Sequence, residues 1–156
     1  MLVKDVMRRE VVTVRRSTTL KELIEIFHKY TYHTIPVLEN KKLVGIIELE
    51  HLLRIFQPHP AHIHELLKSV PFLEEEERNI FELEITSEMA MLCLVDDIME
   101  RKFLTIGEDA TVQEARRLMK LHQTQRLPVV DKKNNLVGII SLFDIILSVF
   151  KDKGIY

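Results

Sequence analysis

The sequence is poor in cysteine, glycine and proline. Its 156 residues include one cysteine, four glycines and five prolines. The single cysteine, Cys93, excludes a disulfide within the chain and a thiolate-rich metal site. The few glycines and prolines, together with the lack of any low-complexity segment, leave little room for disorder or for an architecture built on glycine loops.

Neither a membrane span nor a strongly basic surface is indicated. The most hydrophobic window, residues 136–150, contains Gly138 and Asp144 and is shorter than the roughly 20 apolar residues that a membrane-spanning helix needs. The opening residues lack the apolar core of a signal peptide, so we expect a cytoplasmic protein. With a formal charge of −2, the chain lacks the broad positive field of a nucleic-acid binder. Neither nucleic acid nor a membrane is therefore expected as a partner.

The chain contains two copies of one sequence unit. Residues 3–39 align with residues 95–131 without a gap, and the run LVGII recurs at 43–47 and 136–140 after one extra residue in the second copy. Identical residues at equivalent positions are Val3/Val95, Asp5/Asp97, Met7/Met99, Arg9/Arg101, Thr13/Thr105, Thr19/Thr111, Glu22/Glu114, Pro36/Pro128 and Val37/Val129. Because one such unit buries too little surface to be stable alone, we expect two repeats, 3–56 and 95–150, to pack about a pseudo-twofold axis within a single module, 1–156.

Each copy has the pattern of a β-α-β-β-α unit. β-Branched runs at 11–14 and 103–106 predict short strands. Apolar residues at helical spacing follow, and a threonine suited to cap a helix precedes them in each copy. Two further strands come next. The first of them contains a proline, which needs a sheet edge or a strand end, and the second, LVGII, has the uniform apolar character of a buried strand. With a closing helix over 49–56 and 142–150, the fold class is α/β.

Residues 57–94 separate the two copies. Helical pieces are predicted at 62–69 and 72–81, which makes this a helical segment between the repeats. The second piece carries the acidic run EEEE, typical of a solvated helix face or helix start. The segment is suited to cap a cleft, to join a dimer interface or to dock a partner, and the sequence leaves these roles open.

The repeated motifs resemble those of a CBS-domain pair, the tandem module named after cystathionine β-synthase. VKDVM and VDDIM, IPVLE…LVGIIE and LPVVD…LVGIISLFDI carry the resemblance. It implies two repeats packed through their sheets, two clefts and a disc that commonly forms a homodimer. Members of the family commonly bind AMP, ADP, ATP or S-adenosylmethionine, and most regulate another domain or protein partner without performing chemistry. For this chain, the resemblance implies an adenine nucleotide as regulatory ligand.

The resemblance also implies residues that hold this ligand. The ribose motif of the family resembles G-h-h-S/T-x-x-D, which is GIISLFD here, with Asp144 accepting from the ribose hydroxyls and Ser141 near phosphate or ribose. A capping box has the same form, in which Ser141 caps a helix and Asp144 reaches back to it. Arg126 matches a basic position of the family that contacts phosphate. Alternatively, it is an exposed arginine whose charge protects a strand edge from aggregation.

Because such clefts are shared between repeats, we expect the motif of the second repeat to face residues 15–18 of the first. Thr18 matches a position at which threonine contacts ligand. Further candidates on this side are Arg15, Arg16, Thr34 and Ile140. The result is a cleft rich in cations and hydrogen-bond donors.

The first repeat has lost the motif. Glu48 and His51 stand at the serine and aspartate positions, and we expect residues 107–110, which include Glu108 and Asp109, to face them. Carboxylates repel phosphate. We therefore expect one nucleotide per chain, held by the second repeat's motif.

Other candidate sites are weaker. His59, His62 and His64 cluster in sequence but complete no recognised metal-ligand spacing, so we interpret them as part of a polar linker and expect no metal. Cys93 lies in an apolar run, which is more typical of a small buried side chain than of a nucleophile. We interpret the pairs Arg8-Arg9 and Arg116-Arg117 as parts of solvent-exposed faces. No acid–base pair or cofactor loop is recognisable, so no enzymatic activity is expected.

Two hypotheses follow. The first is a regulatory sensor that binds an adenine nucleotide between its repeats and signals to a partner. The alternative is a ligand-independent dimerisation or scaffold module with vestigial clefts. The alternative explains the lost first motif equally well, but not the concentration of arginines and Asp144 on the other side.

Overall fold

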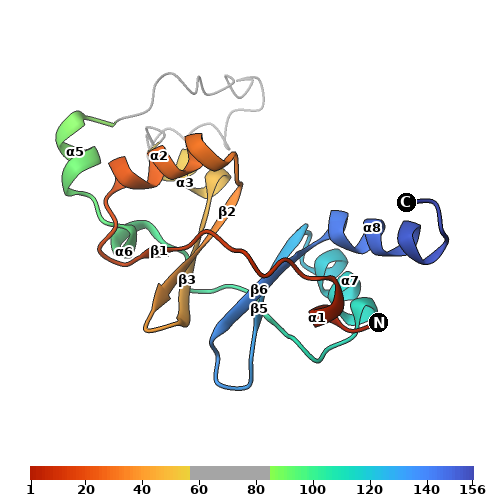
Figure 1. The fold of residues 1–156 in the computed structure, drawn as a ribbon. Coiled ribbons are helices and arrows are strands. Elements are labelled where there is room, and N and C mark those ends of the chain that lie inside the picture. The colour runs from red at the N-terminus through yellow and green to blue at the C-terminus, as the bar shows by residue number, and fades with distance from the viewer. Residues whose placement is uncertain (57–84) are drawn as a thin grey trace, which may run out of the picture.

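The structure, a computed structural model, describes residues 1–56 and 85–156 and consists of two lobes, each built on a three-stranded sheet (Figure 1). In the first lobe, strands β1 (Val14–Arg15), β2 (Thr34–Glu39) and β3 (Lys42–Glu48) lie in that order, with helices α2 (Leu20–Tyr30) and α3 (Leu49–Phe56). In the second lobe, strands β4 (Ile106–Gly107), β5 (Arg126–Val130) and β6 (Leu136–Ser141) accompany α7 (Val112–Leu121) and α8 (Leu142–Asp152). The predicted α/β fold of two β-α-β-β-α repeats is confirmed.

Both sheets are mixed, and their prolines lie where the ladder permits them. β1 runs parallel to β2 and pairs only with Val37 and Leu38, whereas β2 and β3 are antiparallel throughout. Pro36 therefore lies beyond the reach of β1 although β2 is the middle strand, so its missing N–H costs no ladder hydrogen bond on that side. β4 likewise pairs only with Val129 and Val130, beyond Pro128.

The first strand of each copy is shorter than predicted. The sequence placed it at 11–14 and 103–106, whereas the structure has it at Val14–Arg15 and Ile106–Gly107. The residues before these strands, 7–13 and 99–105, are extended connectors that cross between the lobes. Their β-branched and apolar character has the same appearance in sequence as a strand, because both conformations are extended and partly buried.

Capping side chains fix the starts of the main helices. Thr19 and Thr111 accept hydrogen bonds from the backbone N–H groups of Glu22 and Glu114, and each glutamate accepts from its threonine's N–H in return. These reciprocal bonds satisfy two N–H groups that would otherwise lack partners at each helix start. Both predicted threonine caps are confirmed.

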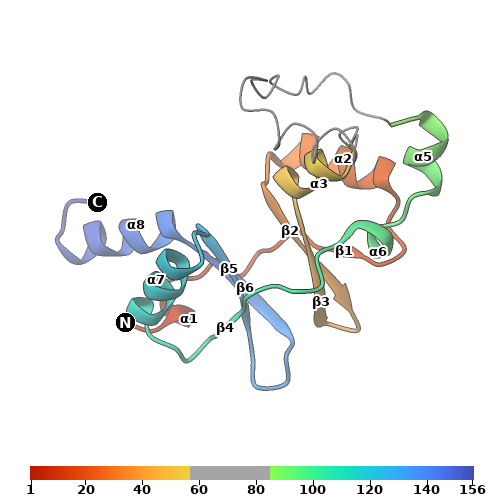
Figure 2. The ribbon, with the colours of Figure 1, turned by 180° about the vertical axis from the view of Figure 1, so that it is seen from behind.

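The two repeats exchange their opening segments. Helix α1 (Val3–Val6) opens the first repeat, yet Val3 and Met7 belong to the hydrophobic core of the second lobe. Helix α6 (Val95–Ile98) opens the second repeat, yet Val95, Ile98 and Met99 belong to the core of the first lobe. Seen from behind, α6 lies near β1, and α1 lies near α7 (Figure 2).

Equivalent hydrogen bonds hold each exchanged helix. The N–H of Val95 donates to the Thr18 carbonyl at 2.8 Å, and the N–H of Val3 donates to the Ala110 carbonyl at 2.9 Å. The loops before α2 and α7 thus bind the opening helix of the other repeat. The backbone acceptors of these loops are used here rather than in the clefts that the sequence led us to expect.

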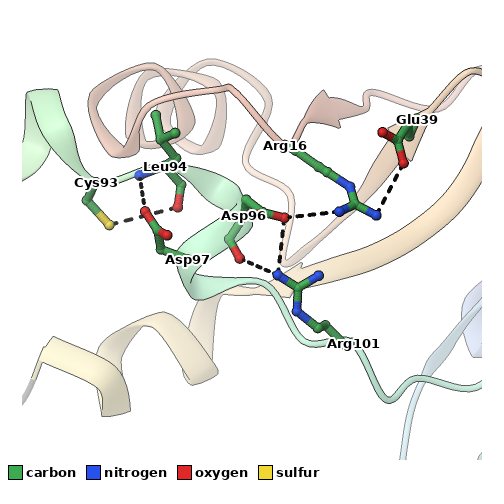
Figure 3. Close-up of polar contacts among 7 residues, drawn as sticks. All are labelled: Arg16, Glu39, Cys93, Leu94, Asp96, Asp97 and Arg101. Carbon is green, nitrogen blue, oxygen red and sulfur yellow. Dashed lines mark hydrogen bonds and ion pairs between the residues drawn. The ribbon is translucent and has the colours of Figure 1, made fainter.

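An ion-pair cluster reinforces the attachment of α6 (Figure 3). Asp96 lies between two guanidinium groups, with its Oδ1 at 3.5 Å from Arg16 and 3.1 Å from Arg101, and Arg16 also pairs with Glu39 at 3.2 Å. The cluster joins α6 to β2 and to the loop before α2. The short helix α5 (Ser87–Leu92) precedes α6 in the chain.

Glycine allows the exchanged segments to approach the sheets closely. A Cβ atom on Gly138 would lie 2.7 Å from the Arg8 carbonyl oxygen and 2.7 Å from the Met7 sulfur. A Cβ atom on Gly45, the equivalent residue in β3, would lie 2.6 Å from the Met99 sulfur. The glycine in each LVGII run is therefore needed for this crossing.

Other sequence expectations fall on different parts of the chain. The helices expected at 62–69 and 72–81, and the histidines at 59, 62 and 64, lie outside the described residues. Within residues 1–56 and 85–156, no helix has both the length and the apolar character to cross a membrane, and no three metal-binding side chains are grouped.

Candidate functional site

A cavity of about 240 Å³ lies between the two lobes at the start of α8. Its second-lobe wall comes from the ends of β5 and β6 and the first turn of α8. Its other wall comes from the connector after α1 and from the residues entering β2. The lining residues are Arg8, Glu10, Val11, Val12, Tyr32, His33, Thr34, Arg126, Ile139, Ser141, Phe143 and Asp144.

Asp144 is the most constrained polar group of this cavity. Its side chain is 9% exposed, and with Ser141 it forms the buried polar pair of the described core. Oδ2 accepts from the Ser141 N–H at 2.9 Å and from the Ser141 hydroxyl, while Ser141 Oγ accepts from the Asp144 N–H at 3.2 Å. The capping box weighed from the sequence therefore exists, and it holds the carboxylate at the cavity wall.

Arg8 completes the surroundings of this carboxylate. Its Nε donates to Asp144 Oδ1 at 2.8 Å, although the Arg8 side chain is 59% exposed. Arg8 and the capping box together engage both oxygens of the carboxylate and hold it in place. The cavity thus contains a fixed anionic acceptor.

Arg126 and Thr34 occupy matching places, each as the first residue of its strand. Arg126 begins β5 and pairs in register with Ser141 across to β6, which aims it at the mouth of the motif. Within the described residues it forms no ion pair, so its guanidinium donors remain available for an anion. Thr34 begins β2 and lines the same cavity.

Apolar side chains line another part of the cavity, beside Glu10, Tyr32 and His33. Val11 and Val12 come from the connector, Ile139 from β6 and Phe143 from α8. A flat apolar ring system fits between such side chains, while the carboxylate and the guanidinium groups serve hydroxyl donors and anions. The arrangement suits a ligand with an apolar ring, vicinal hydroxyls and negative charge.

The structure brings together only part of the residue set expected from the sequence. Arg126, Ser141, Asp144 and Thr34 share the cavity. Thr18 and Arg15 line a separate hollow beside α2, and Arg16 is engaged by Glu39 and Asp96. Ile140 is fully buried in the core of the second lobe, and its neighbour Ile139 faces the cavity instead.

The expectation that residues 15–18 face Asp144 is wrong because that loop binds α6 through its backbone. The connector at Arg8, Val11 and Val12 faces Asp144 in its place. Sequence reasoning interpreted Arg8 as part of a solvated face and the valines as a strand. One available signal was the repeat itself, because Arg8 is equivalent to Glu100 and Asp144 to His51, so both positions change charge between copies.

The first repeat carries the reversed arrangement. His51 Nδ1 lies 3.0 Å from Glu100 Oε1, in place of the Asp144–Arg8 pair. Glu48 stands in place of Ser141, and burial raises its pKa, with the Glu100 and Glu50 carboxylates raising it further. The acidic character expected here is present, but it comes from Glu100, because residues 107–110 are bound to α1.

Cys93 lacks the features of a nucleophile. It packs against the first core. Burial raises the pKa of its thiol, and the nearby Asp97 carboxylate raises it further. A reactive cysteine needs the opposite shift.

Both repeats match a known family model and known proteins. The model of the CBS domain matches residues 3–58 and 95–151. Uncharacterized protein MJ1426 of Methanocaldococcus jannaschii is 32% identical over 151 residues, which cover 94% of this chain and 89% of that protein. CBS domain-containing protein DDB_G0289609 of Dictyostelium discoideum is 30% identical over 146 residues, covering 93% of this chain and 88% of that protein.

Other relatives are longer. The chain spans 43% of MJ0188 and 22% of the inosine-5'-monophosphate dehydrogenase of Methanocaldococcus jannaschii, at 28% and 29% identity over 94% and 91% of the chain. In these proteins the matching region is one part of a larger polypeptide.

Solved structures share the fold. The complex of CBSX2 with AMP superposes with a TM-score of 0.70 at 22% identity, covering 97% of this chain and 98% of that chain; CBSX2 is a CBS-pair protein from Arabidopsis thaliana. The CBS domain pair of MJ0100 from a complex with 5-methylthioadenosine and S-adenosyl-L-methionine gives 0.63 at 23% identity, covering 98% of each chain. With the family model matched twice and two relatives of at least 30% identity matched over most of their length, the chain belongs to the CBS domain family and contains two copies of the domain.

Proposed function

We propose that this chain is a regulatory module that binds one adenine nucleotide in the cavity between its lobes. Asp144 accepts from the ribose hydroxyls, Arg126 binds phosphate and Val11, Val12 and Ile139 contact the base. Ser141 and Thr34 complete the polar wall. The observation that carries the proposal is the combination, in one cavity, of a positioned carboxylate and an arginine without an ion-pair partner in the described chain.

The fold neighbours support this ligand class. CBSX2 was solved with AMP, and the MJ0100 pair with two adenosine derivatives. The first repeat is not a second site in this proposal, because Glu48 and Glu100 would lie close to a phosphate there and repel it. Binding of one nucleotide per chain follows.

Regulation follows from where the ligand makes contact. It touches the connector of the first repeat and the motif of the second, so it stabilises one relative arrangement of the lobes by no more than its differential affinity for the two arrangements. A protein partner that senses this arrangement would receive the signal. No catalytic role, metal or nucleic-acid partner is part of the proposal, and the cytoplasmic location stays a prediction.

Isothermal titration with adenosine, AMP, ADP, ATP and S-adenosylmethionine tests the proposal. We expect saturable binding near one ligand per chain. Arg126→Ala should weaken the phosphate-bearing ligands about tenfold or more, because hydrogen bonds to charged groups contribute roughly 1.5–3 kcal/mol. Adenosine, which lacks phosphate, should bind the variant and the wild type equally.

Arg116→Ala is the matched control, since it removes an exposed arginine of α7 outside the cavity. It should leave all affinities unchanged. Asp144→Asn tests the ribose contact with a nearly isosteric side chain. Absence of binding by any of the five ligands to folded wild-type protein would reject the proposal.

A second candidate function rests on the outer face of α8. Phe143, Ile146, Val149 and Phe150 are between 45% and 60% exposed on this one helix. Such a stripe suits a homodimer or a scaffold contact that needs no ligand. Light scattering at micromolar concentration, compared between wild type and Ile146→Lys, tests it: a dimer lost in the variant supports the contact, and a monomeric wild type rejects the homodimer.

A further inference from the structure

We infer that the Arg8 side chain occupies part of the nucleotide cavity in this structure. When the ribose binds Asp144, the Arg8 guanidinium leaves this carboxylate and moves to the ligand phosphate. The inference rests on the proposed function and concerns one residue that follows α1. It assigns to Arg8 a specificity role for phosphorylated over unphosphorylated ligands. Four observations on the described residues carry it.

The first observation is that both oxygens of Asp144 are engaged. Oδ2 belongs to the capping box with Ser141, and Oδ1 accepts from Arg8 Nε. Two ribose hydroxyls bring two donors to this carboxylate. Because the cap is part of helix α8, Oδ1 is the oxygen open to exchange, and the ligand competes there with Arg8.

The second observation is the size of the cavity. At about 240 Å³ it falls below the roughly 300–1,000 Å³ typical of small-molecule sites. Turning one side chain out of the cavity would enlarge the space for a nucleotide. Among the polar lining groups, Arg8 lies at the cavity while 59% of its side chain is exposed, so it has solvent space into which to turn.

The third observation is that the Arg8 backbone is fixed. Its N–H donates to the Ile139 carbonyl at 2.9 Å, and its carbonyl accepts from the Ile139 N–H at 2.9 Å. This doubly bonded bridge to β6 keeps the guanidinium at the cavity after it leaves Asp144. Its other nitrogens form no hydrogen bond within the described chain, and Arg126 lines the same cavity. The two guanidinium groups then share one phosphate-bearing ligand.

The fourth observation is the reversed pair of the first repeat. Glu100, the equivalent of Arg8, pairs with His51. An anionic side chain gains nothing from a phosphate, so only the second repeat's site has a residue that can be exchanged in this way. Arg8 itself lies between α1, which packs in the second core, and the connector leading to β1.

Titration of adenosine and AMP into wild type and Arg8→Ala tests the inference. Adenosine should bind the variant several-fold more tightly, because the competing donor is gone and adenosine offers no phosphate in exchange. The AMP-to-adenosine affinity ratio should fall about tenfold, since AMP loses the compensating contact. Arg8→Gln, which retains a donor without charge, should lower the ratio as well.

His51→Ala is the matched control, because it breaks the equivalent pair in the first repeat. It should leave the affinities for both ligands unchanged. Unchanged or weaker adenosine binding to Arg8→Ala and Arg8→Gln, with wild type binding AMP, overturns the role of Arg8 and leaves the proposed function standing. A wild-type protein that binds neither ligand overturns both.

Discussion

Gly138 shows how one residue sets the distance between the connector and the second sheet. An added Cβ atom would meet the Arg8 carbonyl oxygen at 2.7 Å, and backbone cannot move aside as a flexible side chain can. Gly138→Ala should therefore lower the free energy of unfolding by about 1–3 kcal/mol, the usual range for overpacking. Urea denaturation followed by circular dichroism measures the change.

Two other glycines provide graded controls. At Gly45 the nearest atom is the sulfur of the flexible Met99 side chain, and the nearest backbone atom, the Glu100 carbonyl oxygen, lies farther away at 3.2 Å. Gly45→Ala should therefore cost less than Gly138→Ala. Gly107 has nothing within 4 Å of an added Cβ, so Gly107→Ala should be neutral or stabilising by up to about 1 kcal/mol. Equal losses in all three variants would contradict this account.

The Glu48 carboxylate is expected to make the stability of the folded protein depend on pH. Its pKa is raised by burial and by neighbouring carboxylates, so the native state binds this proton more tightly than the unfolded state does. The charged form therefore opposes folding at neutral pH, and stability contributed by protonation is lost as pH rises through the raised value. Glu48→Gln should raise the unfolding temperature at pH 7.

The same measurement at acid pH is the test of this cause. The difference between Glu48→Gln and wild type should shrink as the pH falls toward and below the ordinary value of 4.5, where both states carry the proton. Glu88→Gln changes a fully exposed glutamate on α5 whose pKa is lowered by hydrogen bonds, and it should not reproduce the neutral-pH gain. A gain for Glu48→Gln that is constant from pH 4 to pH 7 would refute the electrostatic explanation.

Among the elements, α1 is short but supplies core to the lobe that contains the candidate site. Val3 is fully buried and packs with residues of α7, β5 and β6. Val3→Ala should lower the free energy of unfolding by about 1.5–3 kcal/mol, from lost burial plus the cavity that remains. Hydrogen exchange should become faster in the second lobe more than in the first.

Val95→Ala is the symmetric control. Val95 has the same full burial, but it lies in the first core, so its exchange should quicken in the first lobe. If each substitution instead affected the lobe of its own repeat, the exchange of opening segments would be wrong.

Sequence periodicity predicted the long helices and strands well. It did not predict which lobe the opening helices and the connectors contact. The helix at 49–56 matches α3, and the LVGII run at 136–140 lies within β6, because an amphipathic stripe and an apolar run are local properties. The partners of α1, α6 and the connectors depend on contacts distant in sequence. Ser141, Asp144 and Arg126 were candidates because they match positions of the family. Arg8, which reaches Asp144 across the exchange, was not a candidate.

In the whole molecule, the charges of the two repeats agree with the exchange of segments. Lys4 of α1 pairs with Asp109 at 2.8 Å, and Asp96 of α6 pairs with Arg16. Lys4 and Asp96 are equivalent residues of opposite sign, as are Arg8 and Glu100. If each opening segment stayed with its own repeat, Lys4 would lie near Arg16, and Glu100 near Asp144. The exchanged arrangement joins unlike charges, and the other would join like charges.

A double-mutant cycle on Lys4 and Asp109 tests this complementarity. Lys4→Glu would place a carboxylate beside Asp109 and Glu108, which should destabilise the protein, and adding Asp109→Lys should recover most of the loss. Because both side chains are substantially exposed, the coupling should be small and should be detected best in low salt. It should fade near 1 M salt, where screening acts within about 3 Å. A cycle with no coupling at low salt would show that the Lys4–Asp109 pair contributes nothing to the selection of the exchange.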